Sequence, residues 1–316
     1  MPPLDVDATP PQLVINRGAS RIRDPKRRRA YIEVVAAAME TRTGLKPTIV
    51  DDTQEAAGSA LEGLSHAPLV TVMGGDGTVR HAAGILAGRS IPLAIVPAGT
   101  GNALAASLGI RGLRTAIAAI RDGVPRTIDL GIAEWGRDGE TAPDGTGPFV
   151  VAAGSGLDAR IMATAHGEWK RRLRFGAYIG ATLREMLRLA PADFVITADG
   201  ETLERRAHLV VVANTGEIIP GLIGPRRPID PSDGHLDLLV VAGRGIPGGV
   251  RSAADLLLRT GDLHGETIRR TVKEVRITTF PPQPVEIDGD VHAPGWLTAR
   301  VAPGGMTLLV PPGKTD

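Results

Sequence analysis

Apolar and polar residues follow one pattern over the first 130 residues of the chain and another pattern after them. In the first part, short apolar, β-branched runs are each followed by a longer stretch with helical spacing. The expected strands are "QLVIN" (12–16), "PTIVDD" (47–52), "PLVTVM" (68–73) and "IPLAIVP" (91–97). Strands that alternate with helices favour right-handed crossovers and a parallel sheet.

Capping residues mark the helices of this part. Asp24 and Pro25 are expected to open a helix that Gly44 ends. The other expected helices cover 52–64, 78–88, the residues after "AGTGN" and "LRTAIAAIRDG". We therefore predict an α/β domain over residues 1–128.

After Asp129 the apolar runs become shorter and more numerous, and Gly, Pro and Asp-Gly turns separate them. This pattern is typical of a β-rich domain with antiparallel pairs, which we expect over residues 129–305. The expected strands are "FVVAA", "DFVITAD", "HLVVVAN", "HLDLLVV", "TVKEVRITT", "PVEID", "LTARV" and "MTLLV". A polar loop is expected over 135–148, and helices over about 170–189 and 247–259.

Composition narrows the function classes. The 316 residues are 42% hydrophobic and 22% charged, with a net charge of +1 and 3% aromatic residues, so a nucleic-acid partner is not expected. There is no cysteine, which excludes disulfides, cysteine zinc sites and thiol nucleophiles. No apolar run is long enough to span a membrane, and the first residues lack a signal-peptide pattern, so we expect a cytoplasmic location.

The loop "GGDGT" (74–78) follows a predicted strand and precedes a predicted helix. Glycine N–H groups in such a loop can surround a phosphate because no Cβ is in the way. Asp76 would repel that phosphate unless a Mg²⁺ lies between them, which makes a nucleoside triphosphate the expected ligand. The alternative is a structural turn in which Asp76 caps a helix.

A second loop, "PAGTGN" (97–102), also joins a strand to a helix. Thr100 and Asn102 provide hydrogen-bonding side chains at a helix N-terminus, where anions are favoured. The loop is neither the three-glycine dinucleotide motif nor a Walker A loop.

Together the two loops resemble the diacylglycerol kinase catalytic-domain family, which includes bacterial lipid kinases, sphingosine kinases and ceramide kinases. Further similar segments follow in order along nearly the whole chain: "INRGAS", "RTIDLG", "AAGSGLDA", "RFGAY", "ANTGEI", "DPSDGHLDLLVV" and "VEIDGD". The GGDGT loop alone also occurs in NAD kinases and phosphofructokinases, but its pairing with "PAGTGN" is more specific to lipid kinases.

The resemblance implies the fold and the site. It implies a parallel-sheet α/β domain of the NAD kinase and lipid kinase type, completed by residues 306–316, and a C-terminal β-sandwich-like domain. The implied ATP-binding residues are Asn16, Thr53, Gly74, Gly75, Asp76, Gly77, Thr78, Gly99, Thr100, Gly101, Asn102 and Lys170. Asp288 matches the general base, and Asp290 a supporting carboxylate. Asp76 and Asp233 match metal-site residues, Asp233 at a structural Mg²⁺.

Each of these assignments has a structural alternative. Asp288 and Gly289 also form a hairpin signal, and Asp233 also suits a capped turn. The segment 168–190 contains Lys170. It is interpreted either functionally, as an ATP-phosphate contact or a basic membrane-facing helix, or structurally, as a core helix with solvated basic residues. Two positions depart from the family pattern: His81 replaces a carboxylate after GGDGT, and Ala103 replaces a frequent Asp. The simpler interpretation of His81 is an ordinary histidine on a helix face.

The function that this resemblance implies is an ATP- and Mg²⁺-dependent lipid kinase of phospholipid metabolism, peripherally bound to the inner membrane surface. Its acceptor would be diacylglycerol, a sphingoid base, ceramide or a related lipid. A non-catalytic nucleotide- or lipid-binding protein and an NAD kinase are the alternatives. The resemblance also leaves a homodimer open.

Overall fold

The computed structural model describes residues 9–51, 66–156, 191–215, 229–242 and 267–313. The chain divides into two compact units, one of residues 1–128 and 304–316 and the other of residues 129–303. The predicted helices over 52–64, 170–189 and 247–259 lie outside the described residues. Within the described part, no helix is long and apolar enough to cross a membrane.

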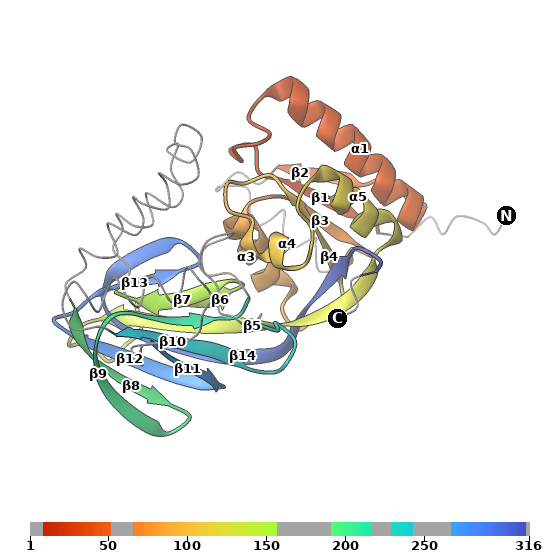
Figure 1. Cartoon of the computed structure of the whole chain (residues 1–316). Helices are drawn as coiled ribbons and strands as arrows, with labels where there is room; N and C mark the ends of the chain where they lie inside the picture. Colours follow the sequence, from red (N-terminus) through yellow and green to blue (C-terminus); the bar gives the residue numbers. More distant parts are fainter. Residues whose placement is uncertain (1–8, 52–65, 157–190, 216–228, 243–266, 314–316) are drawn as a thin grey trace. The chain divides into compact units, whose positions relative to one another are not determined.

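The first unit is a parallel sheet with helices, as predicted (Figure 1). Its strands are β1 (Gln12–Ile15), β2 (Thr48–Asp51), β3 (Val70–Gly74) and β4 (Pro92–Pro97), joined by the end of β14 (Asp290–Val310). Their order is β14-β4-β3-β1-β2, and all these pairs are parallel. The strands are apolar because the sheet is buried: β1 and β3 are buried at every position.

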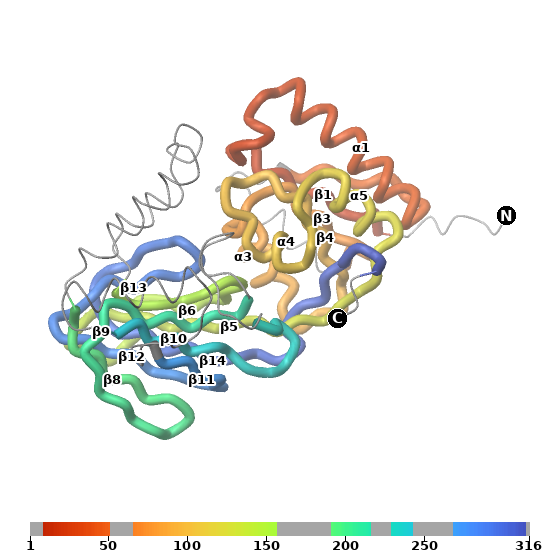
Figure 2. Tube along the Cα trace, in the orientation of Figure 1, coloured from red at the N-terminus to blue at the C-terminus, as the bar shows by residue number. Residues whose placement is uncertain are grey.

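Four helices are described in this unit. They are α1 (Pro25–Thr43), α3 (Asp76–Leu86), α4 (Ala103–Ser107) and α5 (Leu113–Asp122). The predicted caps of α1 are confirmed: Asp24 accepts a hydrogen bond from the N–H of Arg27, and Gly44 ends the helix at φ 75°. Helix α1 packs against α5, and α5 packs on β4 (Figure 2). The helix predicted from Thr78 begins two residues earlier, at Asp76.

The second unit is mostly antiparallel, as predicted. Its strands are β5 (Val124–Arg137), which starts in the first unit, β6 (Gly145–Phe149), β7 (Ala152–Ser155), β8 (Ala192–Ala198), β9 (Glu201–Ala213), β10 (Leu236–Ala242), β11 (Thr267–Val272), β12 (Glu274–Phe280), β13 (Pro284–Ile287) and the first part of β14. Pairing closes six of them into the ring β9-β7-β13-β14-β12-β8. The core of this unit includes Phe149, Phe194, Val210, Ile277 and Leu297.

One loop prediction and four strand predictions were wrong in detail. The polar loop predicted over 135–148 is largely the β5–β6 hairpin, in which Trp135 pairs with Gly145. "FVVAA" breaks after Phe149, and "TVKEVRITT" is divided between β11 and β12. "LTARV" and "MTLLV" belong to one strand, β14, which continues through Gly304 although that residue has φ 62°.

Candidate functional site

Three loops of the first unit leave the same edge of the parallel sheet. Strands β1, β3 and β4 are neighbours, and their carboxyl ends carry Asn16, the 74–78 loop and the 97–102 loop. Ligands of open α/β sheets bind at this edge. The structure therefore brings together the candidate ATP-binding residues that sequence reasoning chose from three separate segments, except Thr53 and Lys170, which lie outside the described residues.

The two glycine loops approach each other backbone to backbone. A Cβ on Gly99 would lie 2.6 Å from the Cα of Gly75, and a Cβ on Gly74 would lie 2.5 Å from Oγ1 of Thr78. Backbone atoms cannot move aside as a flexible side chain can, so Gly99 has a packing reason for being glycine. Gly77 differs, because a Cβ there would meet nothing within 4 Å.

Asp76 is hydrogen-bonded to the other loop. Its Oδ2 accepts the N–H of Ala103 (3.1 Å), and its Oδ1 accepts the N–H of Leu104 (3.3 Å). The carboxylate therefore caps α4, a helix distant in sequence, and stabilises the first-turn amides of that helix. Each oxygen keeps a second lone pair, so this capping is compatible with a Mg²⁺ held through water on the other side.

Asn102 holds the second loop in shape. It adopts a left-handed conformation with φ 55°, and it is 6% exposed. Its Oδ1 accepts the N–H of Gly99 (2.9 Å), and its Nδ2 donates to the carbonyl of Gly99 (2.8 Å). The hydroxyl of Thr100 donates to Ser20 Oγ (3.2 Å). The Asn102 side chain thus shapes the loop by hydrogen-bonding both backbone groups of Gly99.

Asn16 connects the loop after β1 to α3. Its Nδ2 donates to Oγ1 of Thr78 (3.0 Å), and its Oδ1 accepts the N–H of Gly18 (2.9 Å). Helix α3 itself begins with no side-chain cap. The N-terminus of a helix without such a cap has backbone N–H groups that can bind an anion.

The second unit contains the candidate general base. Asp288 and Gly289 form the two-residue turn between β13 and β14, with φ 49° and 96°. Both φ angles are positive, as in the common hairpin turn. The Asp288 carboxylate accepts three N–H groups, from Val150 (2.8 Å), Val151 (2.8 Å) and Ala152 (3.0 Å). We call residues 150–152 the amide segment.

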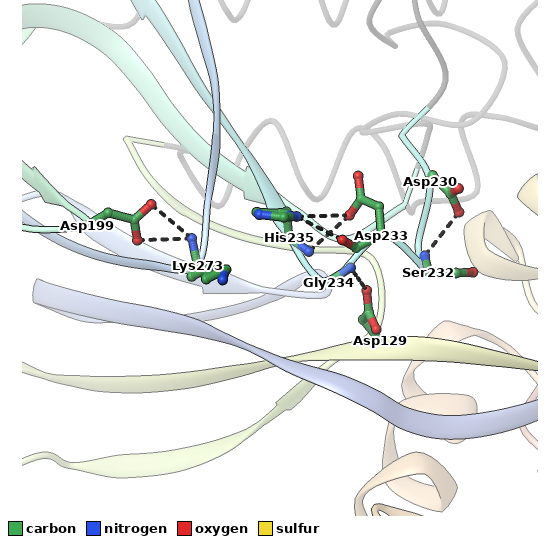
Figure 3. Close-up of polar contacts among 8 residues, drawn as sticks. All are labelled: Asp129, Asp199, Asp230, Ser232, Asp233, Gly234, His235 and Lys273. Carbon is green, nitrogen blue, oxygen red and sulfur yellow. Dashed lines mark hydrogen bonds and ion pairs between the residues drawn. The ribbon is translucent and has the colours of Figure 1, made fainter.

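A second turn of the same unit has nearly the same geometry. Asp199 and Gly200 join β8 to β9 with φ 48° and 87°. The Asp199 carboxylate accepts the N–H groups of Lys273 (3.0 Å) and Glu274 (2.9 Å), as Figure 3 shows in part. The geometry of Asp288 is therefore not by itself a sign of catalysis, and Asp199 offers an internal structural comparison.

Two carboxylates flank Asp288. Asp290 is exposed at the start of β14, one residue after the turn. Glu286 is 4% exposed, and its Oε1 accepts the N–H of Gly289 within the same hairpin. Sequence reasoning missed Glu286. The usable signal was a carboxylate between Val285 and Ile287 in a predicted strand, since buried carboxylates are rare unless paired.

The turn containing Asp233 is built from local hydrogen bonds (Figure 3). Asp230 Oδ1 accepts the N–H of Ser232 (3.0 Å), and Asp233 Oδ1 accepts the N–H of His235 (2.9 Å). The carboxylate of the buried Asp129 accepts the N–H of Gly234 (2.7 Å). No group of three or more candidate metal-ligating side chains occurs among the described residues. The structural Mg²⁺ site at Asp233 remains a prediction.

His81, the departure from the family pattern, is exposed on α3. An exposed position on a helix agrees with the simpler interpretation, an ordinary histidine on a helix face.

Family comparison covers both units. The diacylglycerol kinase catalytic domain family matches residues 12–133, and the YegS C-terminal NAD kinase beta sandwich-like domain matches residues 150–310. The "Diacylglycerol kinase" of Mycobacterium tuberculosis is 36% identical over 182 residues, which are 54% of this chain and 53% of that protein. The "Probable lipid kinase YegS-like" of Pseudomonas putida is 27% identical over 268 residues, 83% of each chain.

An uncharacterized protein of Synechocystis is 26% identical over 247 residues, 77% of this chain but 54% of that protein. The chain thus spans about half the length of the first curated relatives that it matches. Among solved structures, a diacylglycerol kinase from Bacillus anthracis has a TM-score of 0.69 at 22% identity, with 97% of this chain and 98% of that chain covered. An NAD kinase from Archaeoglobus fulgidus has a TM-score of 0.51 at 13% identity, with 96% and 94% covered. Both likenesses concern the fold.

Proposed function

The chain belongs to the diacylglycerol kinase catalytic-domain family with a YegS-type C-terminal domain, and we propose that it transfers the γ-phosphate of ATP to a lipid hydroxyl. The observation that supports this proposal is the assembly of the "GGDGT" and "PAGTGN" loops at one sheet edge, where α3 begins without a side-chain cap. Phosphoryl transfer requires mainly positioning and charge stabilisation, which such an edge can provide.

The ATP phosphates are assigned to the first turn of α3. Backbone donors and the helix dipole favour an anion there, and the small glycines let it approach the main chain. Asn16 and Asn102 hydrogen-bond within the loops at this edge. Gly77 leaves open space beside the chain, whereas Gly101 lies against the Asp76 carboxylate, 2.9 Å from where its Cβ would be. A Mg²⁺ near Asp76 would neutralise charge on the phosphates when bound.

Asp288 is assigned as the base that accepts the proton of the acceptor hydroxyl. Its carboxylate is held by the amide segment, which fixes its direction. Asp290, beside the same turn, is assigned as a supporting carboxylate.

The acceptor is assigned to the diacylglycerol-like lipids because the relatives named above are called diacylglycerol and lipid kinases. Such a lipid lies in a membrane and ATP in the cytoplasm, so the reaction would take place at the inner membrane surface, with the chain bound peripherally. A homodimer remains an expectation from the family resemblance.

The test is an assay with radiolabelled ATP, Mg²⁺ and mixed micelles of diacylglycerol, sphingosine, ceramide or phosphatidylglycerol, with NAD as a further acceptor. We expect one labelled lipid. Asp288→Asn should reduce its formation by at least a hundredfold. Asp199→Asn is the matched control, because it changes a similar turn and similar amide contacts but no assigned base; it should keep most of the activity.

Label on NAD and on no lipid would identify an NAD kinase. ATP binding without any labelled acceptor would identify a non-catalytic binding protein. Equal losses in Asp199→Asn and Asp288→Asn would mean that Asp288 has a structural role only.

A further inference from the structure

Asn214 is a fully buried polar residue directly after β9, in "ANTGEI", and the proposed reaction has not assigned it a role. Its side-chain Nδ2 donates to the carbonyl of Asp129 (2.9 Å) and, more weakly, to that of Val150 (3.4 Å). Its backbone N–H donates to the carbonyl of Val151 (2.8 Å). One residue thus connects β5 to the amide segment.

The amide segment needs such support because part of it lies outside the strand ladder. β6 ends at Phe149 and β7 begins at Ala152, so Val150 and Val151 lie between two strands. The amides that hold Asp199 are supported differently. Glu274 begins β12, which pairs with β8 and β14. Lys273 lies between β11 and β12, and its carbonyl accepts the N–H of Val301 on β14 (2.9 Å). In the amide segment, the side chain of Asn214 supplies a contact that a neighbouring strand supplies there.

The far end of this connection is itself fixed. The N–H of Asp129 donates to the carbonyl of Pro231 (2.6 Å). The Asp129 carboxylate accepts the N–H of Gly234 (2.7 Å), and Figure 3 shows this second contact. Asp129 is 3% exposed. A carbonyl held in this way is a firm anchor for the Asn214 side chain.

Burying the side chain of Asn214 is energetically unfavourable, which also indicates a specific role for this residue. Its Oδ1 is buried and has no hydrogen-bond partner in the described part of the chain. An unpaired buried acceptor is destabilising, and a leucine of similar size would avoid it. The amino group of the side chain is therefore the useful part of this residue.

We propose that Asn214 is a positioning residue: it fixes the amide segment and, through that segment, the direction of the Asp288 carboxylate. The catalytic consequence rests on the proposed function of Asp288, whereas the structural coupling does not. The two can therefore be tested separately.

The structural coupling is tested by amide hydrogen exchange of the full chain without substrate. In Asn214→Ala and in Asn214→Leu, exchange at residues 150–152 should become about five- to tenfold faster than in the wild type. Amides near the turn of the β8–β9 hairpin, residues 196–203, should stay unchanged and serve as the internal reference, because this end is distant from the pairing of Ala213 with Ala152. Asp288→Asn should raise exchange at 150–152 as well.

Thr215→Val is the matched control. Thr215 is the next residue, is 1% exposed and has a buried hydroxyl without a partner in the described chain. Replacing it should leave exchange at 150–152 unchanged. The coupling is refuted if Thr215→Val acts like Asn214→Ala, or if exchange rises equally in the hairpin and the amide segment.

The catalytic consequence is tested with the lipid kinase assay. Asn214→Ala should lower kcat by ten- to a hundredfold, on the order expected for a displaced catalytic group, with the KM for ATP unchanged. In an Asp288→Asn background the same substitution should have little further effect. Undiminished kcat with altered exchange would refute the positioning role, whereas an inactive wild type with altered exchange would refute the proposed function and leave the coupling intact.

Discussion

At the scale of single residues, the close approach of Gly75 and Gly99 determines which substitutions the two glycine loops can accept. We predict that Gly99→Ala lowers the free energy of unfolding by about 1–3 kcal/mol, because its Cβ would meet backbone at 2.6 Å. Gly77→Ala is the matched control: it lies within α3 with no atom near its Cβ, and it should raise that free energy by about 0.5–1 kcal/mol. Urea unfolding of both variants measures this. A stable Gly99→Ala would show that the loops separate easily.

Asp76 allows a second prediction, because its carboxylate already has a structural partner. Asp76→Asn would place an amino group against one of the two α4 amides, which donate to the carboxylate in the wild type. We expect a loss of about 1–2 kcal/mol in the free energy of unfolding, measured in EDTA without nucleotide. Metal removal would therefore not abolish the difference between the variant and the wild type. A difference that appears only with Mg²⁺ and ATP would mean that Asp76 acts on the ligand alone.

At the scale of elements, the hairpin β13–β14 can be compared with the hairpin β8–β9. Gly289 and Gly200 both have strongly positive φ angles, 96° and 87°. Alanine at either site should lower the free energy of unfolding by about 1–2 kcal/mol. Only Gly289→Ala should also reduce phosphoryl transfer, since it disturbs the turn that carries Asp288. Thermal unfolding and the lipid assay, run on both variants, measure the two effects. Equal activity in the two variants would contradict the assignment of Asp288.

The same elements indicate what the sequence could predict. Local signals placed α1 correctly: Asp24, Pro25 and Gly44 act on their own helix ends. Both glycine loops were found because their signal lies within a few neighbouring residues. The partners of Asp76 and Asp288 were not found, because they lie 27–28 and 136–138 residues away. Such contacts depend on the order of the strands in the sheet, and no local sequence pattern encodes that order.

The predicted ends of several strands were wrong for the same physical reason, because they also depend on partners distant in the sequence. In β14, Pro303 and Gly304 are strong turn signals, yet the strand continues through them. The β5–β6 hairpin is polar and glycine-rich, and it pairs nevertheless. In each case the pairing partner overrides the local preference.

At the scale of the whole molecule, β14 contributes to both units. Its residues Thr307 and Leu308 pair with β4 in the first unit, and residues 297–300 pair with β12 in the second. Leu308 and Leu297 are both fully buried, one in each unit. The strand therefore contains two matched sites for asking whether the units are stabilised separately.

We predict that Leu308→Ala and Leu297→Ala each lower the free energy of unfolding by about 2–5 kcal/mol, the usual range for truncating a buried leucine. Because local stability follows local packing, Leu308→Ala should speed amide exchange in β3 and β4 and weaken ATP binding, since β4 leads into the 97–102 loop. Leu297→Ala should speed exchange in β8 and β12 and leave ATP binding nearly unchanged. Exchange mass spectrometry and ATP titration of both variants measure this. If both variants accelerated exchange equally throughout the described strands, the chain would unfold as one cooperative body and the glycine loops would depend on the core of the second unit.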